Sequence, residues 1–239
     1  MSASELASKV ETDGFAVVPD VLVETASAPV EAALARLSEA STARRGSQVY
    51  GARNLLSESP EIRALTQAAA VRDIIDPIVT SSAFAVRGLF FDKSPAANWA
   101  VNWHQDRVIS VTEKHESHGF TLWSTKAGIP HVQPPLSIIE RMLAVRIHLD
   151  DCDDSNGPLQ VIPGSHKLGY LESGAIQDLV NRCKPVTCLV PRGGVVLMRP
   201  LTLHSSAKAN STRHRRVIHI EFTTDELPPP LRWAFRDLS

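Results

Sequence analysis

The stretch "NWAVNWHQDRVISV" (residues 98–111) combines bulky apolar side chains with one histidine and one carboxylate. Its composition is typical of a β-strand, and in an extended chain residues i and i+2 point to the same face. His104 and Asp106 therefore share a face, close to Trp99 and Val101. A carboxylate in apolar surroundings is costly unless it is paired or bound to a metal. The stretch predicts either a metal site or a polar pair on a solvated strand.

Further strand-like runs follow from about residue 83 onward. They are bounded by Pro, Gly and Asn and read "AFAVRGLFF", "RMLAVRIHLDD", "GPLQVIPGS", "PVTCLVPR", "GGVVLMRPL" and "RRVIHIEF". Many short strands separated by turn residues are typical of a β-sandwich or a closed barrel. Residues 110–136 are long for a connection between strands, and connections of that length are often functional lids. We therefore expect a β-core at 83–239 with a lid-like insertion.

Residues 1–82 carry helical signals instead. Residues 30–37 have apolar side chains at the i, i+3, i+4 and i+7 spacing of an amphipathic helix. Ser59 followed by Pro60 and an acid is typical of a helix start. Helices first and strands later indicate an α+β fold, with helices packed on one sheet of the β-core. Because no linker interrupts the chain, we expect a single domain over residues 1–239.

The charge of the chain is nearly balanced, with 25 Lys and Arg against 26 Asp and Glu. This balance argues against nucleic acid or an anionic membrane as a partner. No apolar segment reaches the roughly 18 residues that span a bilayer, and the N-terminus lacks the features of a secretory signal. The three cysteines have no C-x-x-C spacing, which favours neither disulfides nor zinc. We expect a cytoplasmic protein with a small-molecule partner, and nothing here indicates its oligomeric state.

A second histidine and two arginines stand at the ends of other strand-like runs. His204 follows "GGVVLMRPLTL", while Arg215 and Arg216 open "RRVIHIEF". Two histidines and one carboxylate on neighbouring barrel strands leave three positions open on iron(II), which suit a keto acid and dioxygen. An arginine nearby can clamp the far carboxylate of that acid through a two-pronged salt bridge. Zinc hydrolysis fits less well, because the chain has no H-E-x-x-H motif.

Four segments in order, "DGFAVVPDVL", "WHQD", "NGPLQVIPGSHKLG" and "MRPLTLHSSAKANSTRHRRVIHIEF", extend this hypothesis. Together they resemble the phytanoyl-CoA dioxygenase family of iron(II)/2-oxoglutarate-dependent oxygenases. The resemblance implies a double-stranded β-helix, or jelly roll, with helices backing one sheet. It implies that His104, Asp106 and His204 hold the iron. It also implies that Arg215 binds the distal carboxylate of 2-oxoglutarate and that Ser206 contacts the same co-substrate.

Two positions depart from the family pattern. The tryptophan that often lines the co-substrate pocket maps only approximately onto this chain, one residue from Trp123. Ala209 stands where many members have asparagine, which leaves Arg216 as the alternative clamp. Strand parity favours Arg215. If Arg215 points inward, His219 does so too, and the alternate apolar residues face the N-terminal helices.

The resemblance implies iron(II), 2-oxoglutarate and dioxygen as cofactors and a small organic molecule as substrate. Asp106 bears on the reaction, because relatives that halogenate lack this carboxylate. Hydroxylation of an unactivated C–H bond, with release of succinate and CO2, is therefore favoured, while desaturation and ring formation stay open. Two other classes remain as alternatives. One is a jelly-roll binding module without turnover, and the other is a cupin-type metalloenzyme that does not use 2-oxoglutarate.

Other polar residues are expected to have structural roles. His148 and Asp150 precede an acidic loop, and we expect a solvated strand end there. Three histidines fall in the insertion: His115, His118 and His131. Their default place is the surface of the lid, with substrate contact as the minority interpretation. Three cations precede the metal strand and could reach a carboxylate or stay on the surface: Arg53, Arg87 and Lys93.

Overall fold

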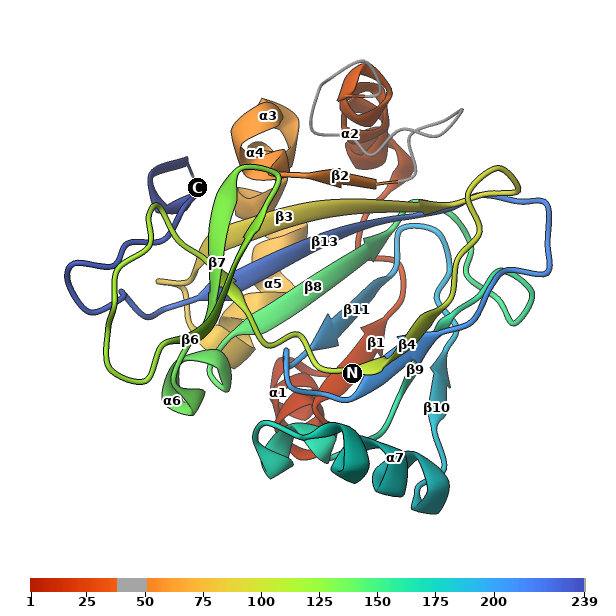
Figure 1. The fold of residues 1–239 in the computed structure, drawn as a ribbon. Helices are drawn as coiled ribbons and strands as arrows, with labels where there is room; N and C mark the ends of the chain where they lie inside the picture. Colours follow the sequence, from red (N-terminus) through yellow and green to blue (C-terminus); the bar gives the residue numbers. More distant parts are fainter. Residues whose placement is uncertain (38–50, 239) are drawn as a thin grey trace.

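Two antiparallel sheets form the core of this computed structural model, which describes residues 1–37 and 51–238. The six-stranded sheet has the order β1 (Phe15–Val18), β11 (Val195–Met198), β8 (Leu143–His148), β13 (Arg215–Thr223), β3 (Phe84–Lys93) and β2 (Gly51–Arg53). The four-stranded sheet has the order β10 (Val186–Cys188), β9 (Leu159–Val161), β12 (His204–Ser206) and β4 (Val101–His104). Figure 1 shows the two sheets on either side of a shared interior. This arrangement confirms the α+β jelly roll expected from the sequence.

Five helices come before the long strands in the described residues, and two of them, α2 and α4, lie where the sequence indicates a helix. They are α1 (Ala3–Asp13), α2 (Glu24–Leu37), α3 (Leu55–Glu58), α4 (Pro60–Gln67) and α5 (Ala69–Val79). Ser2 and Glu5 form a capping box at α1, and Ser59 accepts a hydrogen bond from the Ile62 amide at α4. Later come α6 (Leu136–Ile139), α7 (Ser173–Arg182) and two short 3-10 turns, Ser165–Leu168 and Arg236–Leu238. None of the helices in the described ranges could span a membrane.

The faces of β13 separate the apolar core from the interior of the barrel. Ile218, Ile220 and Phe222 pack in one buried cluster with the apolar side chains of α1 to α5. Full burial of a side chain as large as Phe222 stabilises the fold by about 1.5–3 kcal/mol. On the alternate face, Arg215 and His219 line a cavity between the sheets. The expected parity of this strand is therefore confirmed.

The insertion at 110–136 is built as a third sheet, not as an open loop. Strands β5 (Ile109–Ser110), β7 (Ile129–Gln133) and β6 (Thr121–Lys126) pair in that order. Ala127 and Gly128 turn the β6–β7 hairpin with positive φ angles of 48° and 78°, as the favoured two-residue hairpin turn requires. The Asn54 side chain donates a hydrogen bond of 3.2 Å to the Ala127 carbonyl. In the view of Figure 1 the hairpin runs across β3, β13 and β8.

Candidate metal centre

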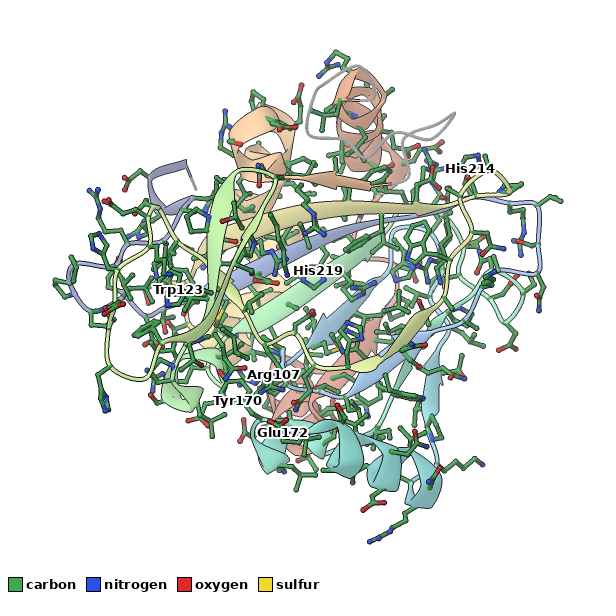
Figure 2. The ribbon with its side chains drawn as sticks, in the orientation of Figure 1. Arg107, Trp123, Tyr170, Glu172, His214 and His219 are labelled. Atoms are coloured by element: carbon green, nitrogen blue, oxygen red, sulfur yellow. The ribbon has the colours of Figure 1, made fainter. Side chains whose placement is uncertain are left out.

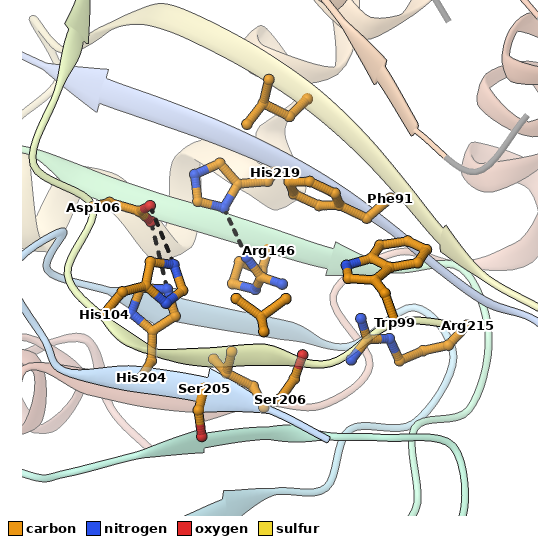
Figure 3. Close-up of a pocket in the computed structure, with 13 residues that line it drawn as sticks. Phe91, Trp99, His104, Asp106, Arg146, His204, Ser205, Ser206, Arg215 and His219 are labelled. Atoms are coloured by element: carbon orange, nitrogen blue, oxygen red, sulfur yellow. Dashed lines mark hydrogen bonds and ion pairs between the residues drawn. The ribbon is translucent and has the colours of Figure 1, made fainter. Parts of the chain in front are cut away.

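Two histidines and one aspartate meet where β4 pairs with β12. His104 and His204 are directly opposite each other in the antiparallel register, with ring centroids 4.2 Å apart. The Asp106 carboxylate lies 3.9 Å from His104 Nε2 and 3.7 Å from His204 Nε2 (Figure 3). The three ligand atoms lie within 4.8 Å of one another. This donor set is the one that non-haem iron(II) sites use.

Backbone carbonyls orient both imidazole rings. His104 Nδ1 bonds to the Asn102 carbonyl at 2.8 Å, and His204 Nδ1 bonds to the Thr202 carbonyl at 2.8 Å. Because a carbonyl oxygen can only accept, each Nδ1 must carry the hydrogen. Each Nε2, the atom that faces Asp106, is then left with a free lone pair. Both rings are thus held in the tautomer that a metal ligand needs.

The protonation states also suit a metal. Burial lowers the pKa of His204 to about 3, and this outweighs the opposing effect of the nearby Asp106 carboxylate. Burial by itself raises the pKa of Asp106, but the imidazoles around it and Arg87 hold that pKa well below its usual range. At neutral pH, therefore, His204 is a neutral donor and Asp106 a carboxylate. Metal binding does not have to displace a proton from either residue.

Gln105 fixes the strand from the opposite face. Its side-chain amide donates to the carbonyls of Gly169 and Leu201 at 2.9 and 2.8 Å. Its side-chain oxygen accepts from the Leu171 amide at 2.9 Å. The side chain is buried, and these partners lie in segments far apart along the chain. Because neighbouring residues point to opposite faces, anchoring Gln105 presents His104 to the interior of the barrel.

A single cavity connects these residues to β13. It has a volume of about 150 Å³ and a lining shared by both sheets (Figure 3). Its lining residues are Leu89, Phe91, Trp99, Val101, His104, Asp106, Arg146, Leu159, His204, Ser205, Ser206, Arg215 and His219. The His–Asp–His group lies at one end and Arg215 at the other.

Arg215 lines the end of the cavity away from the metal ligands, and a second buried cation, Lys93, contacts the lining residue Ser206 there. Arg215 donates to the Gly157 carbonyl, while its Nε has no hydrogen-bond partner among the described residues. Lys93 pairs with Arg215 across β3 and β13, and its Nζ donates to Ser206 Oγ at 2.9 Å. Burial and the neighbouring Arg215 lower the pKa of Lys93 to about 7. Neither cation forms an ion pair within the described part of the chain, so this end is suited to an anion.

The structure places the alternative clamp and Trp123 elsewhere. Arg216 lies on the other face of β13, where its guanidinium contacts Asp150 at 2.7 Å and Glu31 at 2.9 Å. Trp123 lies on β6, packs against the apolar cluster of the insertion and is not part of the cavity lining (Figure 2). Trp99 lines the cavity on the Arg215 side instead. Trp99 lies two residues before β4, and no sequence pattern there predicts the direction of its ring.

A buried polar network, which sequence reasoning missed, lies against Asp106. Arg146 donates to His219 Nδ1 at 3.0 Å. A guanidinium only donates, so His219 Nε2 carries the hydrogen and donates to Glu221 at 3.2 Å. Glu221 also accepts from Arg87 at 3.0 Å. The ligand atoms of Asp106, His219 and Glu221 lie within 4.8 Å of one another. Alternation along β13 was the signal that could have identified this network.

The expectation for His148 was wrong. Its side chain is 2% exposed and faces the barrel interior from β8, opposite Val217. Burial, with Arg146 and Arg215 nearby, holds the pKa of His148 well below its usual range. The reason is that β8 is a central strand with both faces covered, so it has no solvated end at this point. Asp150, in contrast, is partly exposed and pairs with Arg216.

The histidines of the insertion differ in how far they are buried. His118 is exposed, as expected for a lid surface. His131 is 3% exposed, so the surface expectation was wrong for this residue. It lies on β7, where its Nδ1 donates to the Ile129 carbonyl and its Nε2 accepts from the Ser110 hydroxyl at 3.1 Å. One hydrogen bond within β7 and one to β5 satisfy both ring nitrogens and let the imidazole be buried.

The sequence of residues 10–217 matches the pattern that defines the phytanoyl-CoA dioxygenase (PhyH) family. The protein belongs to the phytanoyl-CoA dioxygenase family. The match covers most of the chain, including the metal ligands and Arg215. Membership confirms the resemblance found in the sequence, and with it the cofactors of this family of oxygenases: iron(II), 2-oxoglutarate and dioxygen.

Individual relatives of this phytanoyl-CoA dioxygenase family member are distant. One is phytanoyl-CoA dioxygenase domain-containing protein 1 of Danio rerio, 23% identical over 190 residues. That match covers 73% of this chain but only 57% of the relative's length. EctD from S. alaskensis, solved with 2-oxoglutarate and 5-hydroxyectoine, has a TM-score of 0.74 at 20% identity, over 99% of this chain and 83% of its own. The 2-oxoglutarate-dependent epimerase SnoN from nogalamycin biosynthesis has a TM-score of 0.67 at 18% identity, over 95% and 90%. These structures share the fold.

The residues of the cavity fit the cofactors of the phytanoyl-CoA dioxygenase family. Two imidazoles with free Nε2 atoms and one carboxylate converge at one end, as an iron(II) site requires. At the other end, the unpartnered Nε of Arg215 provides a donor for a carboxylate, and the nearby Lys93 amine adds positive charge behind Ser206. An elongated dicarboxylate matches a cavity with a metal site at one end and cations at the other.

Proposed function

We propose that the protein is an iron(II)/2-oxoglutarate-dependent oxygenase that hydroxylates an unactivated C–H bond of a small organic molecule. The observation that carries the proposal is the single cavity between a His–Asp–His group and a pair of buried cations. In this proposal, bound iron and 2-oxoglutarate supply the oxidising power, with dioxygen consumed and succinate and CO2 released.

His104, Asp106 and His204 would hold the metal. Their contribution is preorganisation, because the backbone bonds at each Nδ1 fix the rings before a metal arrives. Gln105 supports the same arrangement from the far side of the strand. Three ligands on one side of an iron ion leave its other positions open for small molecules.

Arg215 would bind the distal carboxylate of 2-oxoglutarate, with Lys93 and Ser206 beside it. The Lys93 amine already contacts Ser206, so both side chains can turn toward one carboxylate without a large movement. Arg146 lies between the two ends of the cavity, with its Nε unpartnered among the described residues. Together these groups would place the keto acid with its other end toward the metal ligands.

Hydroxylation is favoured over halogenation because Asp106 is kept as a ligand candidate. The structural neighbours SnoN and SnoK are described as an epimerase and a carbocyclase. The same set of ligands therefore supports several outcomes, and the choice depends on how the substrate is held. Our proposal of hydroxylation rests on the retained carboxylate and is tested by the mass of the product once a substrate is in hand.

The first experiment is an anaerobic titration of the protein with iron(II) and then with 2-oxoglutarate. A weak visible charge-transfer band is expected only when the keto acid chelates the metal. Succinate formed after admission of air then measures turnover, in the wild type and in His104→Ala and Arg215→Ala. Arg216→Ala is the matched control, because its side chain lies on the opposite face. We expect the first two variants to lose succinate formation and the control to keep it.

The alternatives give different results in the same experiment. A cupin-type metalloenzyme that does not use 2-oxoglutarate would bind iron but develop no charge-transfer band. A binding module without turnover would show the band and form no succinate with any substrate. Loss of activity in Arg216→Ala with activity kept in Arg215→Ala would refute our assignment of the clamp.

A further inference from the structure

A group of positive side chains lies on the side of Asp106 that faces the insertion, away from Arg215. We call Arg53, Arg87 and Lys126 the entrance cations. Arg87 pairs with Glu221 across β3 and β13 and contacts its carboxylate at 3.0 Å. Arg53 pairs with Leu89 across β2 and β3, and Leu89 lines the cavity. Side chains that are directly opposite on paired strands share a face, so Arg53 is on the face that borders the interior.

The β6–β7 hairpin brings Lys126 to the same place. Lys126 is the last residue of β6, next to the turn that the Asn54 side chain binds. Burial lowers the pKa of Lys126, and so do the charges of Arg87 and Arg53, whereas Asp106 and Glu221 raise it. The Lys126 amine is therefore influenced by charges of both signs. Within the described ranges, this amine makes no hydrogen bond or ion pair.

The carboxylates in this region have other partners. Glu221 accepts hydrogen bonds from Arg87 and His219. Asp106 is one of the three proposed metal ligands, and iron would take its charge. Neither carboxylate is thus available to neutralise Lys126. Arg87 also has a buried Nε–H without a partner among the described residues.

His131 adds no charge near the entrance cations. Burial and the nearby Arg87 lower the pKa of His131 to about 4, so the ring is neutral at physiological pH. Its two nitrogens are used by the Ile129 carbonyl and the Ser110 hydroxyl. Among the described residues, the positive charge at this end that has no partner is therefore that of Lys126, and Arg87 adds its unpartnered Nε–H.

We propose that the substrate is an organic anion whose acid group is bound by Lys126 and Arg87 at the entrance, with the rest of the molecule extending past Asp106 to the metal. The inference rests on the proposed function and names its substrate class. Arg87 is buried and Lys126 is partly buried. Cations that are partly removed from water and whose carboxylate neighbours are already used bind an anion strongly, because the anion replaces lost hydration. Binding the acid group to the insertion would also fix which carbon of the substrate lies at the metal.

The test is a binding measurement on the protein with iron(II) and saturating 2-oxoglutarate under argon. The probes are benzoate, its neutral isostere benzamide, and phenyl phosphate, each titrated calorimetrically. We expect wild type to bind at least one of the two anions about tenfold or more tighter than benzamide, the effect of one charge-assisted hydrogen bond. Comparing benzoate with phenyl phosphate distinguishes a carboxylic acid from a phosphate ester as the anionic group.

Two variants assign the preference to the entrance. Lys126→Met keeps the aliphatic stem and should abolish the preference for anions over benzamide. Lys114→Met removes an exposed lysine of the same insertion, so it has the same change in net charge and should keep the preference.

Equal binding of the anions and benzamide by wild type, no anion binding at all, or a preference that survives in Lys126→Met would each overturn the inference. The charge-transfer band, recorded in the same samples, reports separately on the proposed function. If the band forms and the preference is absent, only the substrate class is wrong. If the band does not form, the proposed function itself has failed.

Discussion

Replacing Lys93 by methionine gives the sharpest test of the co-substrate end of the cavity. Methionine has a similar length and apolar character, so the fully buried stem keeps much of its packing. What is lost is the amine that contacts Ser206 and neighbours Arg215. The free protein should tolerate this change well, because burial of the lysine charge is itself unfavourable.

The expected effect on 2-oxoglutarate is large and depends on pH. A hydrogen bond to a charged group contributes about 1.5–3 kcal/mol, so the Kd should rise about tenfold to a hundredfold in Lys93→Met. The pKa of Lys93 in the free protein is lowered to about 7, from 10.5 for the unperturbed group. Above pH 7 the free protein must take up a proton to bind the dicarboxylate with a charged Lys93. The wild-type Kd should therefore rise by up to about tenfold per pH unit above 7.

The assay is the anaerobic charge-transfer titration at pH 6.5, 7.5 and 8.5, with Lys208→Met as control. Lys208 is an exposed lysine in the connection between β12 and β13. It follows Ala207, whose carbonyl accepts a hydrogen bond from the Lys93 amine. The control should behave as wild type. A Kd for Lys93→Met within about threefold of wild type at pH 6.5, or an unchanged pH dependence, would refute the reasoning.

The same lysine makes a prediction about folding. Because its pKa is lower in the folded than in the unfolded protein, the unfolded chain binds the extra proton between pH 7 and 10.5. Its contribution to the free energy of unfolding is present above 10.5 and is lost as the pH falls to about 7. Lys93→Met should lack this rise of stability with pH, as measured by urea unfolding without co-substrate.

Three further changes test the supports of the site. Gln105→Leu leaves three buried backbone partners of Gln105 unsatisfied. It should lower the free energy of unfolding, measured in urea titrations, by about 2–4 kcal/mol and weaken iron binding. Unchanged iron affinity would show that His104 does not need Gln105 to hold its position. Arg216→Ala removes two partly exposed ion pairs, with Asp150 and with Glu31, and should cost at most about 1 kcal/mol for each pair, with the 2-oxoglutarate Kd unchanged. Asn98→Ala removes two hydrogen bonds to the Ala209 backbone, and the Kd for 2-oxoglutarate should rise severalfold while the iron Kd stays the same.

Period-two alternation accounts for most of what the sequence predicted about the site. It placed His104 and Asp106 on one face, and it put Arg215 and His219 together on the interior face of β13. The ordered motifs then supplied the jelly-roll topology, which alternation alone does not determine. Local spacing suffices for Arg215 and His219 because both lie within β13, whereas Asp106 lies two residues beyond the end of β4 and reaches the same place through the extended chain that follows the strand.

The buried cations needed information that a single strand does not carry. Arg87 and Lys93 lie at alternate positions of a run of apolar residues, where the sequence leaves surface and interior equally open. Burial of Arg87 depends on Glu221, which reaches it only through the register of β3 and β13. The strands of the insertion were not predicted, for a related reason. Strand β6 is largely exposed, so it lacks the apolar pattern by which a strand is recognised.

The position of β4 has a consequence for the metal-free protein. This strand ends the four-stranded sheet, and among the described strands its ladder partner is β12 alone. A metal ion bound by ligands from both strands would hold the outermost strand, β4, to β12. Removal of the metal by a chelator should loosen β4 and expose backbone groups that pair readily with another chain. Concentrated apoprotein should therefore self-associate faster than the iron-loaded protein, and hydrogen exchange at the amides of β4 should accelerate before that of β13.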